Sequence, residues 1–143
     1  MRLRMFRYFY IFLLLVCTLF VCAFRWGNIG EKGALLYFSP DPIQKENVQN
    51  VGRNFRAGNR IYYMLINPKG FRDEYIRVQI VKKEQKTNQW GYKLYWTKDF
   101  HIDTTMKEFM SYFVIDEPGY YFMQIFSFDD FDRVIARNDF WVK

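Results

Sequence analysis

The chain has 143 residues, of which half are hydrophobic and 22% are aromatic. This length allows one compact domain with a single appended segment, and so many aromatic residues exclude a disordered or low-complexity protein. The formal net charge is +6, with one histidine and two cysteines. So few histidines and cysteines exclude most metal sites built from these ligands and any framework of several disulfides. We expect no metal and no cofactor.

Residues 1–25 are predicted to form a membrane anchor or signal segment. Three arginines precede 17 uncharged residues, 8–24, and Arg25 ends the run. That length lies at the short end for a membrane-spanning helix. Because arginines favour the cytoplasmic side, we expect a single-pass protein with a cytoplasmic N-terminus and a domain outside, facing the periplasm from a bacterial inner membrane. The alternative is a signal peptide cleaved near Ala23, which would release a secreted domain.

The net charge is concentrated in this first segment. Four arginines and no acid lie before residue 26, so the remainder holds 17 basic and 15 acidic residues. A nearly neutral remainder is poor evidence for nucleic-acid binding, and no nucleic-acid partner is expected. Residues 53–98 hold 11 Lys and Arg against 3 acids, and residues 99–143 hold 4 against 9. We expect the two stretches to neutralise each other on one mixed surface.

Residues 26–54 are predicted to be a tether that contains one short strand. Glycines fill the first part of the tether, the strand is expected at Leu35–Phe38, and two prolines follow it. Proline lacks the N–H that continues a sheet, so the strand should end there. The polar stretch 43–54 is predicted to be a loop. We assign the strand at 35–38 to the β-sandwich domain predicted for residues 55–143.

From residue 55 the chain has the pattern of short strands separated by turns. Apolar and polar side chains alternate, and turn residues recur between the runs, as in Asn67-Pro68-Lys69-Gly70. The predicted strands are Asn59–Ile66, Glu74–Lys83, Trp90–Asp99, Lys107–Ile115, Tyr120–Phe128 and Arg133–Val142. This rhythm predicts an all-β fold: an antiparallel β-sandwich of seven or eight strands, preceded by the N-terminal transmembrane helix.

Alternation also predicts which residues of the last two strands face the core. Tyr121, Met123 and Ile125 should point inward, together with Phe140 and Val142. A β-sandwich interior is filled by such inward rows from its two sheets.

The run Asp116-Glu117-Pro118-Gly119-Tyr120-Tyr121-Phe122-Met123 resembles the entry to the penultimate strand of immunoglobulin-like and fibronectin-like domains. In those domains an Asp-x-Gly/Ala-x-Tyr run places a tyrosine at a corner, with its hydroxyl bonded to upstream backbone. The resemblance implies an immunoglobulin-like β-sandwich with Tyr121 as the corner tyrosine. Met123 stands where antibody domains have a disulfide cysteine, so that bridge is absent. A likeness of fold implies no activity.

Aromatic side chains on the strands are the candidate binding residues. Rigid rings bury a large area at a small entropy cost, so a row of them suits a protein partner or a stacked sugar ring. One row must belong to the core, and we expect the other to be a contact surface. The candidates form two rows, Tyr120, Phe122, Phe126 and Trp141, and Trp90, Tyr92 and Trp96; Leu94 is expected on the same side of its strand as the second row.

Catalytic and metal-binding patterns are weak. His101 is the one histidine, and none of Ser39, Ser111 and Ser127 lies in a nucleophile-elbow pattern. The acidic run 129–132 lacks the glycine and distal glutamate of an EF-hand-like loop and is predicted to be a solvated hairpin turn. We therefore expect a protein without catalytic activity, with a hydrolase as the residual alternative.

These observations favour a membrane-anchored, non-catalytic binding or structural subunit, or an accessory module, of a cell-envelope protein assembly. Its expected partners are envelope or membrane proteins, and residues 8–24 would contact the membrane. The alternative function is a carbohydrate-binding module for an envelope or extracellular glycan, which would use an exposed aromatic row as its stacking platform.

Overall fold

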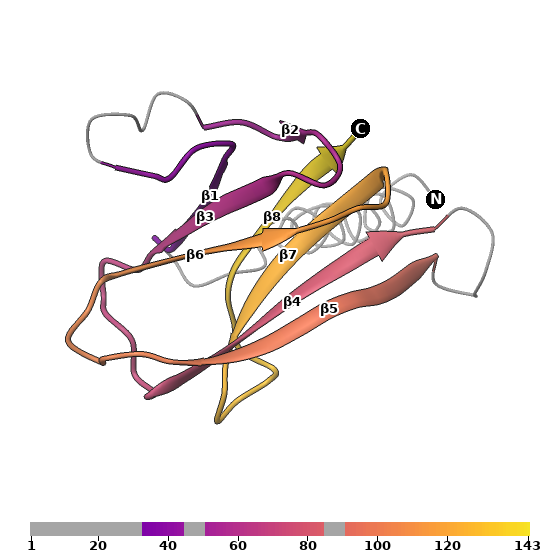
Figure 1. Cartoon of the computed structure of the whole chain (residues 1–143). Coiled ribbons are helices and arrows are strands. Elements are labelled where there is room, and N and C mark those ends of the chain that lie inside the picture. The colour runs from indigo at the N-terminus through magenta and orange to yellow at the C-terminus, as the bar shows by residue number, and fades with distance from the viewer. Residues whose placement is uncertain (1–32, 45–50, 85–90) are drawn as a thin grey trace, which may run out of the picture.

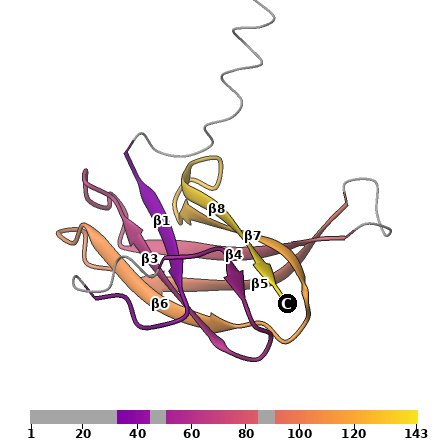
Figure 2. The ribbon, with the colours of Figure 1, turned by 90° about the horizontal axis from the view of Figure 1, so that it is seen from above.

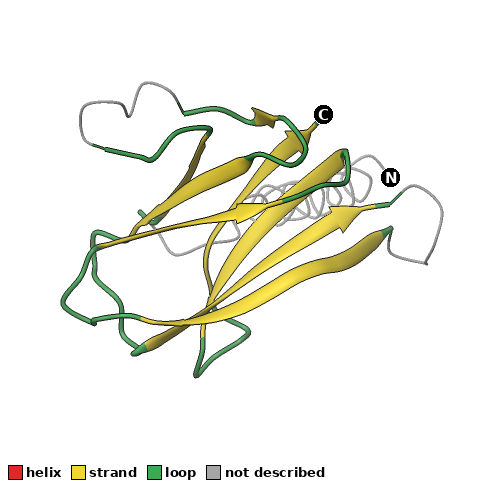
Figure 3. Cartoon of the chain, in the orientation of Figure 1, coloured by secondary structure: helices red, strands yellow, loops and turns green. Residues whose placement is uncertain are grey.

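The computed structural model describes residues 33–44, 51–84 and 91–143, and these ranges contain strands and no helix (Figure 3). The all-β prediction is therefore confirmed for the described part of the chain. The strands, in chain order, are β1 (Leu35–Ser39), β2 (Asn54–Phe55), β3 (Arg60–Ile66), β4 (Tyr75–Lys83), β5 (Tyr92–His101), β6 (Glu108–Val114), β7 (Gly119–Ser127) and β8 (Val134–Val142).

The strands form two sheets that lie as two layers (Figures 1 and 2). One sheet has three strands in the order β1-β3-β6, and the other has five in the order β2-β8-β7-β4-β5. Neighbouring strands are antiparallel except β2 and β8, which are parallel. The predicted antiparallel pairing is thus confirmed for every pair but this one.

Each strand predicted from the sequence is present, with its ends shifted by at most two residues. The turn predicted after β3 is also present, since Gly70 has a φ of 75° and its N–H donates to the Asn67 carbonyl at 2.8 Å. Strand β2 was not predicted, because two residues are too few to show alternation. The predicted boundary between residues 54 and 55 falls inside β2.

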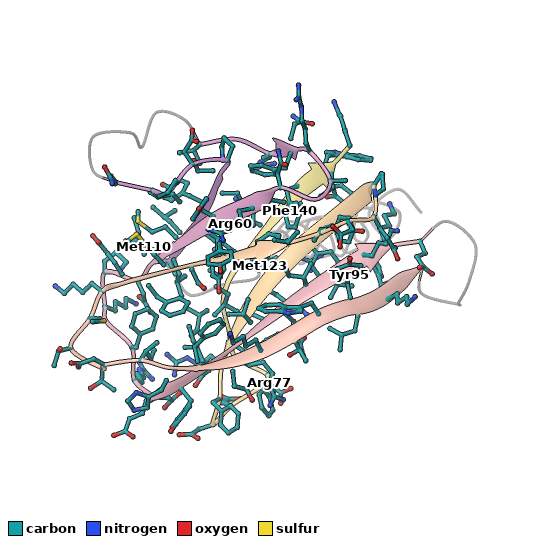
Figure 4. The ribbon with its side chains drawn as sticks, viewed as in Figure 1. Arg60, Arg77, Tyr95, Met110, Met123 and Phe140 are labelled. Atoms are coloured by element: carbon teal, nitrogen blue, oxygen red, sulfur yellow. The ribbon has the colours of Figure 1, made fainter. Side chains whose placement is uncertain are left out.

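The predicted inward row forms the core between the sheets. Tyr121, Met123, Ile125 and Phe140 are fully buried, and Val142 is 2% exposed. Figure 4 shows Met123 and Phe140 in this interior. The facing layer supplies buried residues from β1, β3 and β6, so both sheets contribute to one apolar cluster.

Phe140 joins the two sheets through ring contacts. Its centroid lies 4.8 Å from that of Phe38 on β1 and 5.4 Å from that of Phe113 on β6. On its own sheet the ring stacks on Tyr121 at 5.7 Å with an interplanar angle of 12°. Such aromatic pairs add stabilisation beyond the burial of their area.

Tyr121 makes the corner contact predicted from the sequence. Its hydroxyl donates a hydrogen bond of 2.8 Å to the backbone carbonyl of Glu117, four residues upstream. The Lys82 ammonium lies over the Tyr121 ring, 5.7 Å from its centroid, and forms a 2.7 Å ion pair with the Glu117 carboxylate. The turn that joins β6 to β7 is therefore tied to both β7 and β4.

The basic and acidic stretches of the sequence neutralise each other by pairing across strands, as expected. Among the described residues, the ion pairs that join them are Arg53–Asp139, Arg77–Asp99 and Lys82–Glu117.

The predicted membrane segment, residues 8–24, lies outside the described residues. Among the residues that are described, no helix combines the length and the apolar character that crossing a membrane requires.

Candidate functional site

Four of the predicted binding residues lie on the outer side of the five-stranded sheet. Tyr120, Phe122 and Phe126 alternate with the inward residues of β7, and Trp141 does so on β8. The strand register places Tyr120 directly opposite Trp141, with ring centroids 4.8 Å apart. Tyr92 and Leu94 of β5 reach the same side, because they stand opposite the outward-facing Lys83 and Val81 of β4. We name the set Tyr92, Leu94, Tyr120, Phe122 and Trp141 the aromatic face.

Phe122 forms the floor of the aromatic face. Its side chain is only 7% exposed, although strand alternation directs it outward. The Arg137 guanidinium covers the ring, 3.9 Å from its centroid, and the Tyr92 ring packs edge-on at 5.5 Å. A cation over an aromatic ring is held by the ring quadrupole. A ligand would therefore meet Arg137 and Tyr92 before it met Phe122.

The accessible part of the aromatic face consists of three side chains around this floor. Leu94 is 52% exposed, Trp141 is 49% exposed and Tyr92 is 44% exposed. Tyr120 is half-buried; burial raises the pKa of its hydroxyl, and a hydrogen bond with Asp139 raises it further. Tyr120 therefore remains a neutral hydrogen-bonding group at physiological pH.

Phe126 is not brought together with Trp141. It lies at the opposite end of β7, beside Arg77 of β4. There the Arg77 guanidinium makes two hydrogen bonds, of 2.7 and 2.8 Å, to Asp99 and stacks near Phe131 at 4.6 Å. The bonds from Arg77 lower the pKa of Asp99. The ion pair and the ring contacts of Arg77, which is labelled in Figure 4, hold this end of the sheet together.

The prediction that Trp96 shares a face with Tyr92 and Leu94 is wrong. In β5, Leu94 stands opposite Val81, and Trp96 stands opposite Ile80, the residue just before Val81. One extra residue on β5 is a β-bulge, which reverses the alternation that follows it.

The bulge turns Tyr95 and Trp96 toward the core. Both side chains pack against the buried cluster, and the Tyr95 ring lies edge-on to Tyr121 at 5.3 Å. Trp96 is therefore a packing residue at the margin of the core. Trp90, the remaining predicted binding residue, lies outside the described residues.

The outer side of the three-stranded sheet is a second exposed apolar surface, which the sequence analysis missed. On β6, Met110 is 54% exposed, Tyr112 is 48% exposed and Val114 is 43% exposed. Leu35 of β1 is 47% exposed. The signal in the sequence is the run from Phe109 to Ile115, which contains no charge.

The described residues give no positive sign of catalysis. His101 is exposed at the end of β5, with its ring 5.0 Å from that of Tyr75. The Ser127 hydroxyl is buried and makes no hydrogen bond, and Ser39 is buried in the other sheet. Within the described ranges, no group of three or more His, Cys, Asp and Glu side chains is placed to hold a metal ion.

Comparisons with known proteins indicate a fold and no family. No protein-family model and no curated protein matches the chain. Among solved structures, the soluble domain of PmoD from Methylocystis sp. ATCC 49242 (Rockwell) is similar with a TM-score of 0.52 and 11% identity, covering 81% of this chain and 95% of that chain.

Two further structures show weaker similarity. Superoxide reductase (neelaredoxin) from Ignicoccus hospitalis has a TM-score of 0.42 at 8% identity, covering 64% of this chain and 76% of that one. The β-glucosidase of Kluyveromyces marxianus has a TM-score of 0.38 at 14% identity, covering 79% of this chain and 14% of that one. Of these three structures, the PmoD domain is similar enough to indicate a shared β-sandwich-like fold, and the functions of these proteins do not transfer.

Proposed function

We propose that this protein is a non-catalytic binding subunit, or an accessory module, of a cell-envelope protein assembly. An anchor at residues 8–24 holds an immunoglobulin-like sandwich outside the cytoplasm, and the aromatic face contacts a protein partner. The observation that carries this proposal is the aromatic face itself. Exposed Trp141, Tyr92 and Leu94 lie on the same side of the sheet as Arg137, and Trp, Tyr and Arg are the residues that dominate binding energy in protein interfaces.

The order of the strands supports an immunoglobulin-like sandwich. β1-β3-β6 follows the A-B-E order of one immunoglobulin sheet, and β8-β7-β4-β5 follows the G-F-C-C′ order of the other. The hydrogen bond from Tyr121 to Glu117 is the corner contact of that family of folds. In this scheme the aromatic face is the outer side of the G-F-C-C′ sheet.

The shape of the face favours a protein over a sugar as its ligand. The Tyr120 and Trp141 rings are tilted by 49° to each other, so they do not make one flat stacking platform. The exposed aliphatic side chain of Leu94 offers apolar contact without any hydrogen-bonding group. A protein partner with its own apolar side chains fits such an uneven surface.

The proposed anchor strengthens binding to partners in the same membrane. Residues 26–34 separate the anchor from β1, and nine extended residues span at most about 30 Å. A domain held this close to the bilayer has a high effective concentration toward membrane-resident partners. Modest contacts on the aromatic face are then sufficient for stable association.

The test is affinity capture with the full-length chain in mild detergent. Trp141→Ala should abolish retention of a specific envelope protein, because it removes the most exposed large ring of the face. Phe131→Ala is the matched control, since Phe131 is 48% exposed but lies in the β7–β8 turn, away from the face. Equal retention by the wild type and by folded Trp141→Ala protein would contradict the proposal.

A glycan is the second candidate ligand, favoured by one arrangement. Trp141 and Tyr120 flank the Asp139 carboxylate, which stands on the same side of β8 as Trp141 and can accept hydrogen bonds from sugar hydroxyls. The purified chain would then be retarded on an envelope polysaccharide without any protein present. Both Trp141→Ala and Asp139→Asn should remove that retardation.

A further inference from the structure

Strand β6 is an edge strand without the usual protection against pairing. Among the described residues it has one neighbour, β3, so its other side presents unpaired backbone groups. Residues 109–115 contain no charge, no proline and no glycine. An exposed edge of this kind is a template for pairing with another chain.

The other three edges of the two sheets are protected. β5 has Lys93 and Lys98 along it and the bulge at Tyr95, and β2 is only two residues long. On β1, the Leu36 carbonyl accepts a 2.7 Å hydrogen bond from the Asn138 side chain of the facing sheet. Charges, bulges, shortness and covering groups are the means by which proteins block edge pairing. Within the described residues, β6 has a single charge, Glu108 at its first position, and none of the other means, so its length from Phe109 to Val114 is unprotected.

The side chains along β6 are also suited to contact with another chain. Met110, Tyr112 and Val114 all stand on the outer side of the strand and are among the most exposed apolar residues. Arg60 of β3 lies over the Tyr112 ring at 4.8 Å, and the Tyr62 ring lies beside it at 5.8 Å. Tyr112 is therefore held in place before any partner arrives (Figure 4 labels Met110 and Arg60 on this sheet).

We propose that two copies of this chain pair through β6, antiparallel about a two-fold axis at Ser111. The two three-stranded sheets then become one continuous sheet of six strands. In this register, Met110 of one copy stands opposite Tyr112 of the second copy, and the reverse pair lies across the axis. Methionine sulfur against an aromatic ring is a favourable contact, and each pair repeats because a two-fold interface is self-complementary.

Charge complementarity selects a second copy in the antiparallel sense. On the outer side of this sheet, Glu108 lies at one end of β6, and Arg60 lies at the other end, opposite Val114. Antiparallel pairing places Glu108 two strands from Arg60 of the second copy. That separation is about 10 Å between backbones, which the two long side chains can bridge. Parallel pairing would instead place Glu108 of one copy beside Glu108 of the second copy.

This interface leaves the aromatic face free, because that face belongs to the other sheet. A dimer paired through β6 therefore carries two aromatic faces, one on each copy. The inference is independent of the proposed function: Trp141→Ala should leave the dimer intact, and a change in β6 should leave each aromatic face intact.

The test is sedimentation equilibrium of the full-length chain in mild detergent. The wild type should be a dimer. Met110→Lys should raise the dimer dissociation constant by about tenfold, because it removes both methionine–tyrosine contacts and places two like charges at diagonal positions across the axis. Thr97→Lys, which adds the same charge to exposed β5, is the matched control and should change nothing. A monomeric wild type, or a Met110→Lys dimer of unchanged affinity, overturns the proposal.

A cross-link tests the register and keeps the proposal falsifiable if Met110→Lys does not fold. Ser111→Cys, with Cys17 and Cys22 changed to Ser, should form a covalent dimer on mild oxidation, because residues at the axis stand directly opposite each other. Thr97→Cys in the same background should stay monomeric on denaturing gels. Absence of the Ser111→Cys cross-link overturns the register. Met110-dependent binding of a monomer to lipid vesicles would show that the membrane, and not a second copy, occupies this surface.

Discussion

The stabilisation from one buried tyrosine hydrogen bond can be measured in this protein, because a second buried tyrosine that lacks such a bond serves as the control. Tyr121 and Tyr63 are both fully buried, on the inner sides of opposite sheets. The Tyr121 hydroxyl donates to the Glu117 carbonyl at 2.8 Å. The Tyr63 hydroxyl lies near Ser111 and makes no hydrogen bond of good geometry with any described residue. Changing each to phenylalanine removes the same oxygen atom from the two environments.

The structure sets the size of each effect. Glu117 is an exposed turn residue, so water can bind its carbonyl once the tyrosine hydroxyl is gone. Tyr121→Phe should therefore cost only the net value of one hydrogen bond, about 1 kcal/mol. The burial of an unpaired polar group by itself costs about 1–3 kcal/mol of stability. Removal of the Tyr63 hydroxyl eliminates this cost. Tyr63→Phe should leave stability unchanged or raise it by up to about 1 kcal/mol, after a small loss of packing.

The assay is thermal unfolding of the full-length chain in mild detergent, followed by near-ultraviolet circular dichroism. Tyr121→Phe should lower Tm by about 4 °C, the shift that 1 kcal/mol produces in a domain of this size. Tyr63→Phe should not lower it. Equal destabilisation by the two changes would refute the reasoning, because the loss would then come from packing rather than from the corner hydrogen bond.

Three further predictions concern the core and the pH limits of stability. Phe140→Ala should lower the free energy of unfolding by about 3–5 kcal/mol in denaturant titrations, because it removes the ring that contacts Phe38 and Phe113 of the facing sheet. A loss below about 1 kcal/mol would contradict the role of Phe140 in joining the sheets. Arg77 lowers the pKa of Asp99, so this ion pair stabilises the fold above the ordinary aspartate pKa of about 3.9 and stops doing so as the pH falls through the lowered value. Asp99→Asn should therefore make the free energy of unfolding depend less on pH in acid. An unchanged pH dependence in acid would count against the pair. Burial raises the pKa of the Tyr63 hydroxyl, so the folded state resists its ionisation: the free energy of unfolding is unaffected by this group below pH of about 10 and falls at higher pH. Tyr63→Phe should therefore make alkaline unfolding shallower than in the wild type. An equal slope would argue against this cause.

The two sheets of this domain expose different kinds of surface. The five-stranded sheet presents rings held in place by Arg137, on a face whose neighbouring strand edge is charged and bulged. The three-stranded sheet presents an uncharged edge with exposed side chains on β6. Binding by strand pairing needs an open edge, and a charged or bulged edge blocks such pairing. The two proposals therefore concern separate parts of the molecule and are tested separately.

The sequence by itself was sufficient to predict every strand except β2, and the inward row. Their period of two is a local property, and burial of an apolar side fixes the register of a strand. The corner contact of Tyr121 was predictable for a similar reason, because its partner Glu117 is only four residues away.

Only the tertiary structure decided which aromatic rings are accessible. The bulge at Tyr95 exists through the pairing of β5 with β4, and it moved Trp96 from the predicted face to the core. Phe122 points outward as alternation requires, but Arg137, fifteen positions along the chain, covers it. The open edge of β6 likewise follows from the order in which the strands join. Alternation specifies the side of a strand to which a residue points, whereas accessibility depends on residues that reach it from elsewhere in the fold.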